Sequence, residues 1–347
     1  SLCYKKLSMS KKNSNVNLKN GFKNFKDLSN VFSKFKSKLD SLNKKNYLVA
    51  VSGGPDSLAL VALTMAYAYQ KKTKFHYALV DHNIRKDSNK EARKVKILLK
   101  KKKIYLNILL NRKKINRNIQ AEARKLRYEI LSNYCKKNKI NTLLTAHNFE
   151  DQIETFFIRL SRGSGLKGLS SMKLLTKISS KVNLFRPLLD VEKKHLIKIG
   201  QNEFGKYFKD PSNKDIKYLR SKFRNLKKPL EKSGIKYEQI FKSIQNLSSS
   251  RNTLEAYFNK IFKKLINKRK RDIFINLKKF NELNNEVKIA LINESIKRLK
   301  KNYYDLRSKK VEGLIQRLKR RDFKKSTLGG CVFFKKDQNL CLKIENF

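Results

Sequence analysis

The chain has 347 residues, with 84 Lys and Arg against 28 Asp and Glu, and a formal net charge of +56 at pH 7. The length suggests two domains at about 150 residues each. The 39% of hydrophobic residues is enough for a core in both, which excludes wholesale disorder. The longest apolar stretch, 47–69, is interrupted by SGGPD. This excludes a membrane span of about 20 apolar residues and predicts a soluble protein.

The excess of positive charge favours a polyanionic partner, nucleic acid above all, because neutralising phosphates releases counterions. The excess is spread along the chain, and it consists mostly of Lys among abundant Asn and Ile, a bias that AT-rich coding can produce. Charge alone therefore leaves a solvated surface as an equal alternative. The four cysteines have no CxxC or metal-ligand spacing. They fit a reducing compartment, expected to be the cytoplasm, with a plastid as the alternative.

Residues 1–45 are rich in Lys, Ser and Asn and contain no Arg. We expect a poorly ordered N-terminal extension here, with a short helix near 31–42. No apolar core of a secretory signal is present in it. A transit peptide is the alternative, the missing Arg counts against it, and Met9 is a candidate start.

Short apolar segments alternate with helical patterns from residue 46 onward. We predict strands at 47–51, 75–82, 104–110 and 141–147, and helices over 58–69, 89–103, 119–137 and 149–163. Such alternation is typical of a parallel sheet covered on both faces. We therefore predict an α/β domain over residues 46–235.

Long amphipathic, Lys-rich stretches such as 287–301 and 311–321 follow. Residues 327–345 read as two alternating strands joined by the turn KDQN. We predict a mainly helical basic domain over residues 236–347 that ends in a β-hairpin. Only weak turn signals between 230 and 250 mark the boundary.

The strongest local signal is the strand-to-helix turn SGGPDS, formed by Ser52, Gly53, Gly54, Pro55, Asp56 and Ser57. Glycines let a backbone approach phosphate closely, and the amides and helix N-terminus supply a positive site, so we expect a pyrophosphate cradle. The GKS or GKT ending of a Walker A loop is absent. A carboxylate at Asp56 beside phosphates makes sense if Mg²⁺ lies between them. The alternative is a plain N-cap turn.

This loop resembles the PP-loop of the N-type ATP pyrophosphatases, which split ATP into AMP and pyrophosphate while adenylating an oxygen of their substrate. Over about residues 47–225, and more weakly beyond, the chain resembles the tRNA(Ile)-lysidine synthetase family. The segments that carry this resemblance, in order, are ALVDHNIR, IQAEARKLRYEIL, LLTAHNFEDQIETFFIRLSRGSGLKGLSSM, LFRPLLDV and KDPSNKDIKYLRSKFRN.

The resemblance implies a ligase that attaches the ε-amine of L-lysine to C2 of the wobble cytidine of tRNA(Ile) with a CAU anticodon. It implies ATP as a substrate, Mg²⁺ as a cofactor and no membrane partner, and it leaves a monomer or a homodimer open. The chemistry is consistent, because the C2 oxygen of cytosine leaves readily only once it is adenylated. The amine, with a free pKa of about 10.4, must also lose a proton.

Asp151 and Glu154 lie three residues apart and so share one face at the start of a predicted helix. Positioned carboxylates can hold an ammonium and move its proton, and the resemblance assigns this DxxE pair to lysine. The alternative is that acids in a first helical turn only complement the helix dipole, which fits Glu150.

His147 follows a predicted strand at the carboxyl edge, where α/β sheets bind ligands. The resemblance places it beside the adenine of ATP, against a purely structural role. We expect Asp81 and His82, at the end of the second strand, near ATP as well.

Arg124 and Arg127 lie one helical turn apart. By the resemblance their segment lines the lysine site, and Arg127 can bind the carboxylate of the substrate bidentately. A solvated basic face is the alternative. The same resemblance puts Arg162 beside substrate phosphates. Arg162 precedes a literal GxGxxG, but this motif follows a helix, which excludes a dinucleotide-binding turn.

Arg220 and Arg224 share a helical face within a segment that resembles the DPSN and YxRxxxR motifs of the family, together with Asp210 and Asn213. We expect the two arginines to contact tRNA phosphate, with salt bridges inside the domain as the alternative.

Two rival functions remain on the same scaffold. A tRNA thiolase also activates a base oxygen with ATP, but it needs reactive cysteines, and Cys135 in a packed helix reads as a small hydrophobe. The second rival is a non-catalytic RNA-binding protein. The presence of SGGPDS, His147, Asp151 and Glu154 together argues against it.

Overall fold

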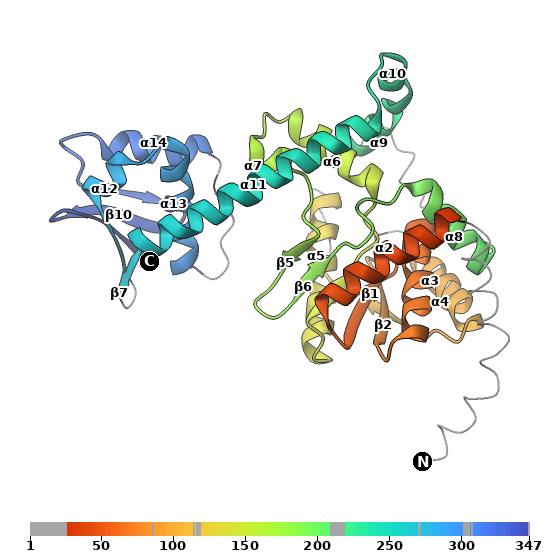
Figure 1. Cartoon of the computed structure of the whole chain (residues 1–347). Helices are drawn as coiled ribbons and strands as arrows, with labels where there is room; N and C mark the ends of the chain where they lie inside the picture. Colours follow the sequence, from red (N-terminus) through yellow and green to blue (C-terminus); the bar gives the residue numbers. More distant parts are fainter. Residues whose placement is uncertain are drawn as a thin grey trace. The chain divides into compact units, whose positions relative to one another are not determined.

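The computed structural model describes residues 26–84, 87–113, 115, 119–208, 219–269, 272–300, 306 and 308–345. The chain divides into a first unit, residues 1–245, and a second unit, residues 246–347 (Figure 1). The expectations for residues 1–25, with Met9, and for Asp210 and Asn213 lie outside the described residues.

The first unit contains a six-stranded sheet in the order β3-β2-β1-β4-β6-β5. Every neighbouring pair is parallel except β5 with β6. The strands are β1 (Asn46–Ala50), β2 (Lys74–Asp81), β3 (Leu106–Leu110), β4 (Thr142–Leu144), β5 (Leu175–Lys177) and β6 (Asn183–Phe185). The strand order reverses between β1 and β4, so the crevice where such sheets bind ligands opens at their carboxyl ends.

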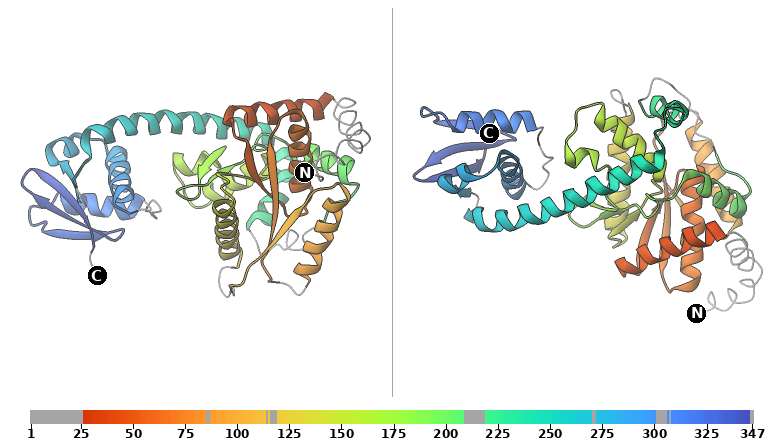
Figure 2. Two further views of the ribbon diagram at one scale, coloured as in Figure 1. Left: turned by 90° about the horizontal axis from the view of Figure 1, so that it is seen from below. Right: turned by 45° about the horizontal axis from the view of Figure 1, so that its top comes forward.

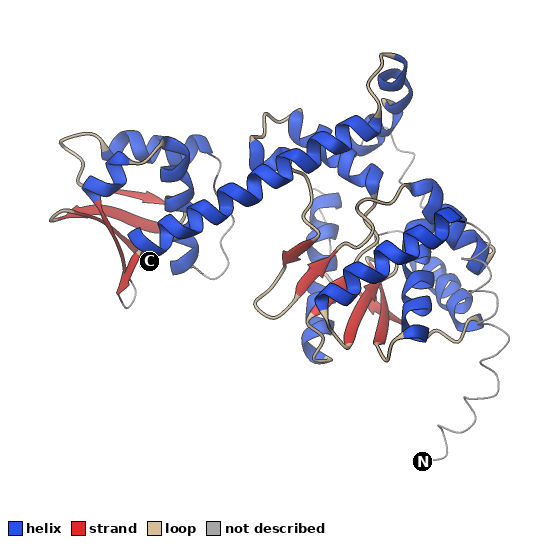
Figure 3. Ribbon diagram, in the orientation of Figure 1, coloured by secondary structure: helices blue, strands red, loops and turns tan. Residues whose placement is uncertain are grey.

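Helices precede, connect and follow these strands (Figure 3). They are α2 (Lys26–Leu42), α3 (Pro55–Gln70), α4 (Ser88–Lys101), α5 (Ile119–Lys137), α6 (Phe149–Leu160), α7 (Leu166–Leu169), α8 (Lys193–Phe204), α9 (Leu219–Asn225) and α10 (Lys227–Lys232). The long helix α11 (Tyr237–Leu265) begins in the first unit and ends in the second.

Alternating side chains divide the sheet between two cores, because successive residues of a strand point to opposite faces. On β1, Tyr47 and Val49 face a core with α2, α3, α4 and α8. Leu48 points the other way, into a core with Leu131 and Cys135 of α5. A parallel sheet buried on both faces needs such continuous apolar strands. The predicted α/β fold class is confirmed.

Helix α2 lies within the segment expected as an N-terminal extension. Figure 2 shows this helix as the first red segment of the ribbon. Its apolar residues Leu28, Val31, Phe35 and Leu39 recur at helical spacing and join the core of the sheet. Lys38 forms an ion pair with Asp190 across the fold. Residues 26–42 are therefore an integral part of the first unit.

The second unit contains an antiparallel sheet in the order β7-β8-β11-β10-β9. Its elements after α11 are β7 (Asn267–Arg269), β8 (Asp272–Asn276), α12 (Leu277–Glu282), α13 (Asn285–Leu299), α14 (Ser308–Leu318), β9 (Lys325–Leu328), β10 (Cys331–Lys336) and β11 (Asn339–Ile344). One core joins the sheet to α13 and α14. The predicted hairpin is β10–β11, closed by the pair Lys336 and Asn339. It is part of a larger sheet, because β8 and β9 flank it.

Candidate active site

The SGGPDS turn leaves the carboxyl end of β1 and opens α3. Ser57 Oγ donates to the carbonyl of Gly54 at 2.9 Å and accepts from the amide of Ser52 at 3.2 Å. The two serine hydroxyls lie 3.1 Å apart. Pro55 begins the helix, where its missing N–H has no intrahelical role. These hydrogen bonds hold the two ends of the loop together. No side chain caps the N-terminus of the helix that follows.

Gly53 is required by both conformation and space. Its φ of +81° lies in the left-handed region, and a Cβ there would stand 2.5 Å from Val95 Cγ2. The Gly53 carbonyl accepts from the amide of Phe208 at 3.0 Å. A plain capping turn has no need of this conformation, so the loop fits the expected phosphate cradle better.

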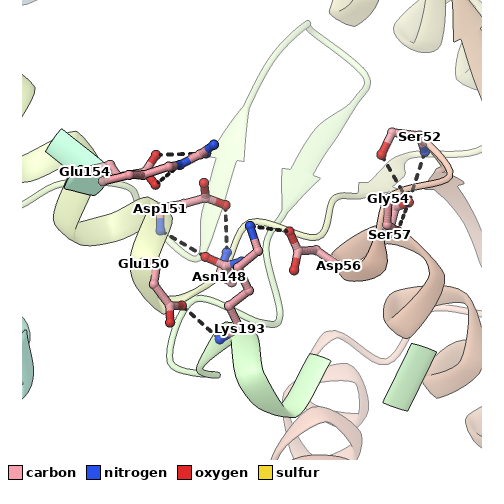
Figure 4. A network of polar contacts seen from close by, with 10 residues as sticks. Ser52, Gly54, Asp56, Ser57, Asn148, Glu150, Asp151, Glu154 and Lys193 are labelled. Carbon is pink, nitrogen blue, oxygen red and sulfur yellow. Dashed lines mark hydrogen bonds and ion pairs between the residues drawn. The ribbon is translucent and has the colours of Figure 1, made fainter. Parts of the chain in front are cut away.

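Asp56 lies in the first turn of α3 and faces the start of α6 (Figure 4). Burial raises the pKa of Asp56 to about 6, and the positive charge of Lys193 opposes this shift. Asp56 Oδ2 lies 4.0 Å from Lys193 Nζ. Its Oδ1 is buried and has no hydrogen-bond partner among the described residues. A buried carboxylate oxygen of this kind is suited to a cation such as Mg²⁺.

Asn148 and Asp151 fix the start of α6 through a capping box. Asn148 Oδ1 accepts from the amide of Asp151 at 2.9 Å, and Asp151 Oδ2 accepts from the amide of Asn148 at 3.1 Å. Asp151 therefore has a structural role, and its contact with lysine stays a prediction. An Asn followed three residues later by an acid was a readable signal for this cap.

Glu154 is only 4% exposed, one turn after Asp151 on α6. Arg224 of α9 holds its carboxylate through two hydrogen bonds, from Nε to Oε1 and, at 3.3 Å, from Nη2 to Oε2. Burial raises the pKa of Glu154, and the bond from Arg224 opposes that shift. Phe157 and Phe223 stack with centroids 5.7 Å apart and so hold α9 against α6. Arg224 makes the internal salt bridge that the sequence left as its alternative role.

Glu150 connects α6 to α8, a contact that sequence reasoning missed. Its Oε2 accepts from the backbone amide of Lys193 at 2.9 Å. Figure 4 shows Lys193 between the α6 carboxylates and Asp56. No local sequence pattern indicates this contact, because the two residues lie 43 positions apart.

His147 follows β4 at the carboxyl edge, and its Nδ1 lies 2.9 Å from Thr145 Oγ1. Burial lowers the pKa of His147 well below its usual value, so the imidazole is neutral at pH 7. The positive charges that act in the same direction come from Arg124, Arg186, Arg127 and Arg220. The structure therefore brings the predicted Arg127 and Arg220 toward His147, and it adds Arg186, which the sequence analysis did not single out.

Arg127 is partly buried on α5, and burial lowers its pKa, with Arg124 and Arg220 acting in the same direction. The guanidinium carbon atoms of Arg124 and Arg127 lie 5.3 and 5.8 Å from the ring centroid of Tyr128. A group of neighbouring guanidinium ions that share an aromatic ring favours an anionic ligand.

Asp81 is the last residue of β2, which pairs with β1, and His82 follows it. Asp81 is 3% exposed, and its Oδ1 accepts from the amide of Asn83 at 2.9 Å. His82 Nδ1 is buried without a partner among the described residues. Burial lowers the pKa of His82, and so does the charge of Arg127.

Arg162 is the predicted site residue that the structure leaves apart from the carboxylates. It lies in the exposed turn after α6, whose last residue, Leu160, stands about 14 Å along the helix from Asp151 at 1.5 Å per residue. The glycine-rich turn that follows comes after a helix, as the sequence indicated.

The cysteines of the described residues are buried and free. Burial raises the pKa of Cys135 to about 12, so it is unsuited to nucleophilic chemistry. No three His, Cys, Asp or Glu side chains gather as a metal site within the described part of the chain. None of the helices in that part is both long and apolar enough to span a membrane.

Comparisons with known proteins agree with this geometry. Residues 27–230 match the family described as the PP-loop domain. The tRNA(Ile)-lysidine synthase of Wolbachia pipientis wMel is 34% identical over 301 residues, which cover 85% of this chain and 69% of that protein. The enzyme of the same name from the Wolbachia of Brugia malayi is 31% identical over 92% of this chain and 73% of its own length.

Among solved structures, the U34-tRNA thiolase NcsA from Methanococcus maripaludis is similar with a TM-score of 0.53. The identity is 20%, over 64% of this chain and 78% of that chain, so the similarity supports the fold alone. The resemblance seen in the sequence is confirmed: the chain belongs to the PP-loop family and, within it, to the tRNA(Ile)-lysidine synthases, ligases that use ATP.

Proposed function

We propose that the chain ligates the ε-amine of L-lysine to C2 of the wobble cytidine of tRNA(Ile) with a CAU anticodon, releasing AMP and pyrophosphate. The observation that carries this proposal is the convergence of two sites. Lys193 Nζ lies 4.0 Å from Asp56 Oδ2 of the PP-loop, and the amide of the same lysine donates to Glu150 Oε2 at the start of α6, so the nucleotide loop and the carboxylates of α6 lie close together.

The first step adenylates the base. The C2 oxygen of cytidine attacks the α-phosphorus of ATP, the bond from that phosphorus to the bridging oxygen breaks, and pyrophosphate leaves with the electron pair. The backbone amides of the turn after β1 would bind the phosphates. The unpartnered Oδ1 of Asp56 fits a Mg²⁺ ion, which would neutralise phosphate charge.

The second step forms the C–N bond. The neutral ε-amine attacks C2, and AMP leaves with the former C2 oxygen. Glu154 is suited to accept a proton from the amine because burial raises its pKa above the usual value. The capping bond of Asp151 uses Oδ2, so its Oδ1 can help to hold the ammonium.

Arg224 forms an ion pair with Glu154, the carboxylate proposed to bind the ammonium of lysine. The guanidinium already uses both oxygens of this buried carboxylate, so in the proposed mechanism the substrate ammonium replaces it. A phosphate of the tRNA is a ready alternative partner for Arg224. Both proposed roles of this residue, tRNA contact and internal salt bridge, then apply in succession.

The remaining roles are assigned by position and charge. Arg127 would bind the carboxylate of lysine, since its neighbours are other cations. The neutral His147 would hydrogen-bond adenine from the carboxyl edge of the sheet. Arg162, Arg220 and the basic second unit would bind tRNA phosphates.

Lysine incorporation tests the function directly. Purified protein, ATP, Mg²⁺ and radiolabelled lysine would be combined with isoleucine tRNA transcripts carrying C or U at the wobble position. We expect label, AMP and pyrophosphate with the C transcript only. Equal labelling of both transcripts would show that the target base is wrong, and the absence of AMP with either would reject the adenylation step.

A further inference from the structure

Lys193 lies at the first residue of α8, opposite a phosphate loop that has no lysine of its own. In Walker A loops a lysine inside the motif contacts the terminal phosphates. Here the ammonium of Lys193 lies 4.0 Å from Asp56 Oδ2. We propose that Lys193 binds the pyrophosphate portion of ATP and stabilises it as it leaves, an inference that rests on the proposed function.

Helix α8 is held directly against the loop helix. A Cβ on Gly200 would stand 3.2 Å from the carbonyl oxygen of Pro55, so a larger residue there would have to move the two helices apart by a few tenths of an ångström. Lys193 and Gly200 are seven residues apart and therefore lie on the same face of α8. The face that packs on the start of α3 thus also presents Lys193.

The backbone of Lys193 is fixed from a second side. Glu150 Oε2 accepts from its amide at 2.9 Å, which ties the first residue of α8 to the start of α6. Because the backbone is anchored, the Cα atom from which the Lys193 side chain extends has a fixed position. The side chain itself is 38% exposed. A ligand on the loop can therefore reach the ammonium.

The charges near the loop change when a nucleotide binds. At present Lys193 neutralises part of the charge of Asp56, whose Oδ1 has no partner among the described residues. A cation held by Asp56 would free the ammonium of Lys193 to contact phosphate oxygens. The three N–H donors of this ammonium, at the end of a flexible side chain, suit that contact.

This position also gives Lys193 a role in the reaction. When the bond between the α-phosphorus and the bridging oxygen breaks, negative charge grows on the leaving pyrophosphate. A fixed positive charge beside it is most effective at that moment. On this basis Lys193 is a catalytic residue of the adenylation step.

Binding of inorganic pyrophosphate, measured by calorimetry on the full chain, tests the contact without any turnover. We expect Lys193→Met to weaken pyrophosphate binding about 10- to 100-fold, the effect of losing one hydrogen bond to a charged group. Lys193→Arg should restore part of the affinity. Lys194→Met is the matched control, because Lys194 pairs with Glu192 at 2.8 Å and should leave binding unchanged.

A double-mutant cycle separates a direct contact from an effect through Asp56. In an Asp56→Asn background, and with EDTA present, Lys193→Met should still weaken pyrophosphate binding if the ammonium contacts phosphate. No further loss in that background, or Lys193→Arg behaving like Lys193→Met, would overturn the inference. If the wild-type chain binds pyrophosphate but never releases AMP with tRNA and lysine, the proposed function fails while the contact stands.

Discussion

The two units differ in the chemistry of the buried polar atoms that have no hydrogen-bond partner among the described residues: in the second unit they include the neutral hydroxyl of Ser326 on β9, and in the first a carboxylate oxygen and an imidazole nitrogen. In the second unit, Ser295 and Asn293 are buried on α13, and each donates to a helix carbonyl four residues back, at 2.7 and 3.2 Å. In the first unit, Asp56 Oδ1 and His82 Nδ1 are buried near the carboxyl edge without partners among the described residues. A buried polar atom without a hydrogen bond is unfavourable unless a ligand completes it. A carboxylate oxygen and an imidazole nitrogen bind cations and protons more readily than a hydroxyl does, which supports the proposal that the chemistry lies in the first unit.

The largest expected effect is at Asp56. Asp56→Asn keeps the shape but removes the charge, so we expect AMP release to fall about 10³-fold, while tRNA binding stays within about two-fold. Single-turnover assays of AMP and filter binding of tRNA would check both. Asp322→Asn, an exposed acid of the second unit, is the control and should change neither. Normal AMP release by Asp56→Asn would remove the proposed metal role.

The second unit should instead be sensitive to substitutions in its hydrophobic core. Leu314 is fully buried between α14 and the sheet, and Leu314→Ala should destabilise this unit by about 3 kcal/mol through lost contacts and a cavity. Hydrogen exchange of β10 and β11 should speed up, while pyrophosphate binding in the first unit is retained. Loss of pyrophosphate binding in this variant would contradict the separation of tasks between the units.

A smaller effect is expected at the pair of Glu154 and Arg224. Arg224→Gln frees the carboxylate, so lysine should bind about ten-fold more tightly in the absence of tRNA, at about 1.4 kcal/mol per ten-fold. Equilibrium dialysis with labelled lysine measures this. Glu154→Gln should weaken lysine binding with and without tRNA. If Arg224→Gln also weakens it, the arginine only positions Glu154, and no exchange of cations takes place.

The smallest expected effect is a pH dependence. The pKa of His147 is lower in the folded chain than in the unfolded chain, so the unfolded state binds more protons below about pH 6.5, and stability falls as the pH drops through that range. Asp56, with a pKa raised to about 6, acts in the opposite direction, because its contribution falls as the pH rises.

Urea unfolding of the wild-type chain and of His147→Gln isolates the histidine. Between pH 7.5 and 5.5 the wild-type chain should lose more stability than the variant, by at most about 1.4 kcal/mol per pH unit. Identical slopes for the two proteins would show that His147 is not held neutral.

The sequence predicted strands β1 to β4 and helices α3 to α6 of the first unit, because apolar runs alternate with helical patterns there, but it did not predict β5, β6 or the helices α7, α8 and α10. The strand at 47–51 and the helix at 58–69 correspond to β1 and α3. The contacts between residues far apart in the chain were not predictable, and Lys193 beside Asp56 is the clearest case. Tertiary packing decides which distant residues meet, and it leaves no periodic pattern in the local sequence.

The sheet of the second unit was only partly foreseen. Strand β8 alternates buried Ile273 and Ile275 with less buried neighbours, a signal for a strand that was available in the sequence. The short β7 has three exposed residues, and its identity as a strand comes only from pairing with β8. Edge strands of this kind depend on a neighbour more than on their own composition.

The buried thiols have a practical consequence for spectroscopy. Cys135, Cys331 and Cys341 are shielded in the two cores, and burial raises the pKa of each, so they should react slowly with maleimides under native conditions. With Cys3 replaced by serine, a single cysteine introduced on an exposed helix position would carry a fluorescent dye selectively. The protein can therefore be labelled for binding studies without removing any cysteine from its cores.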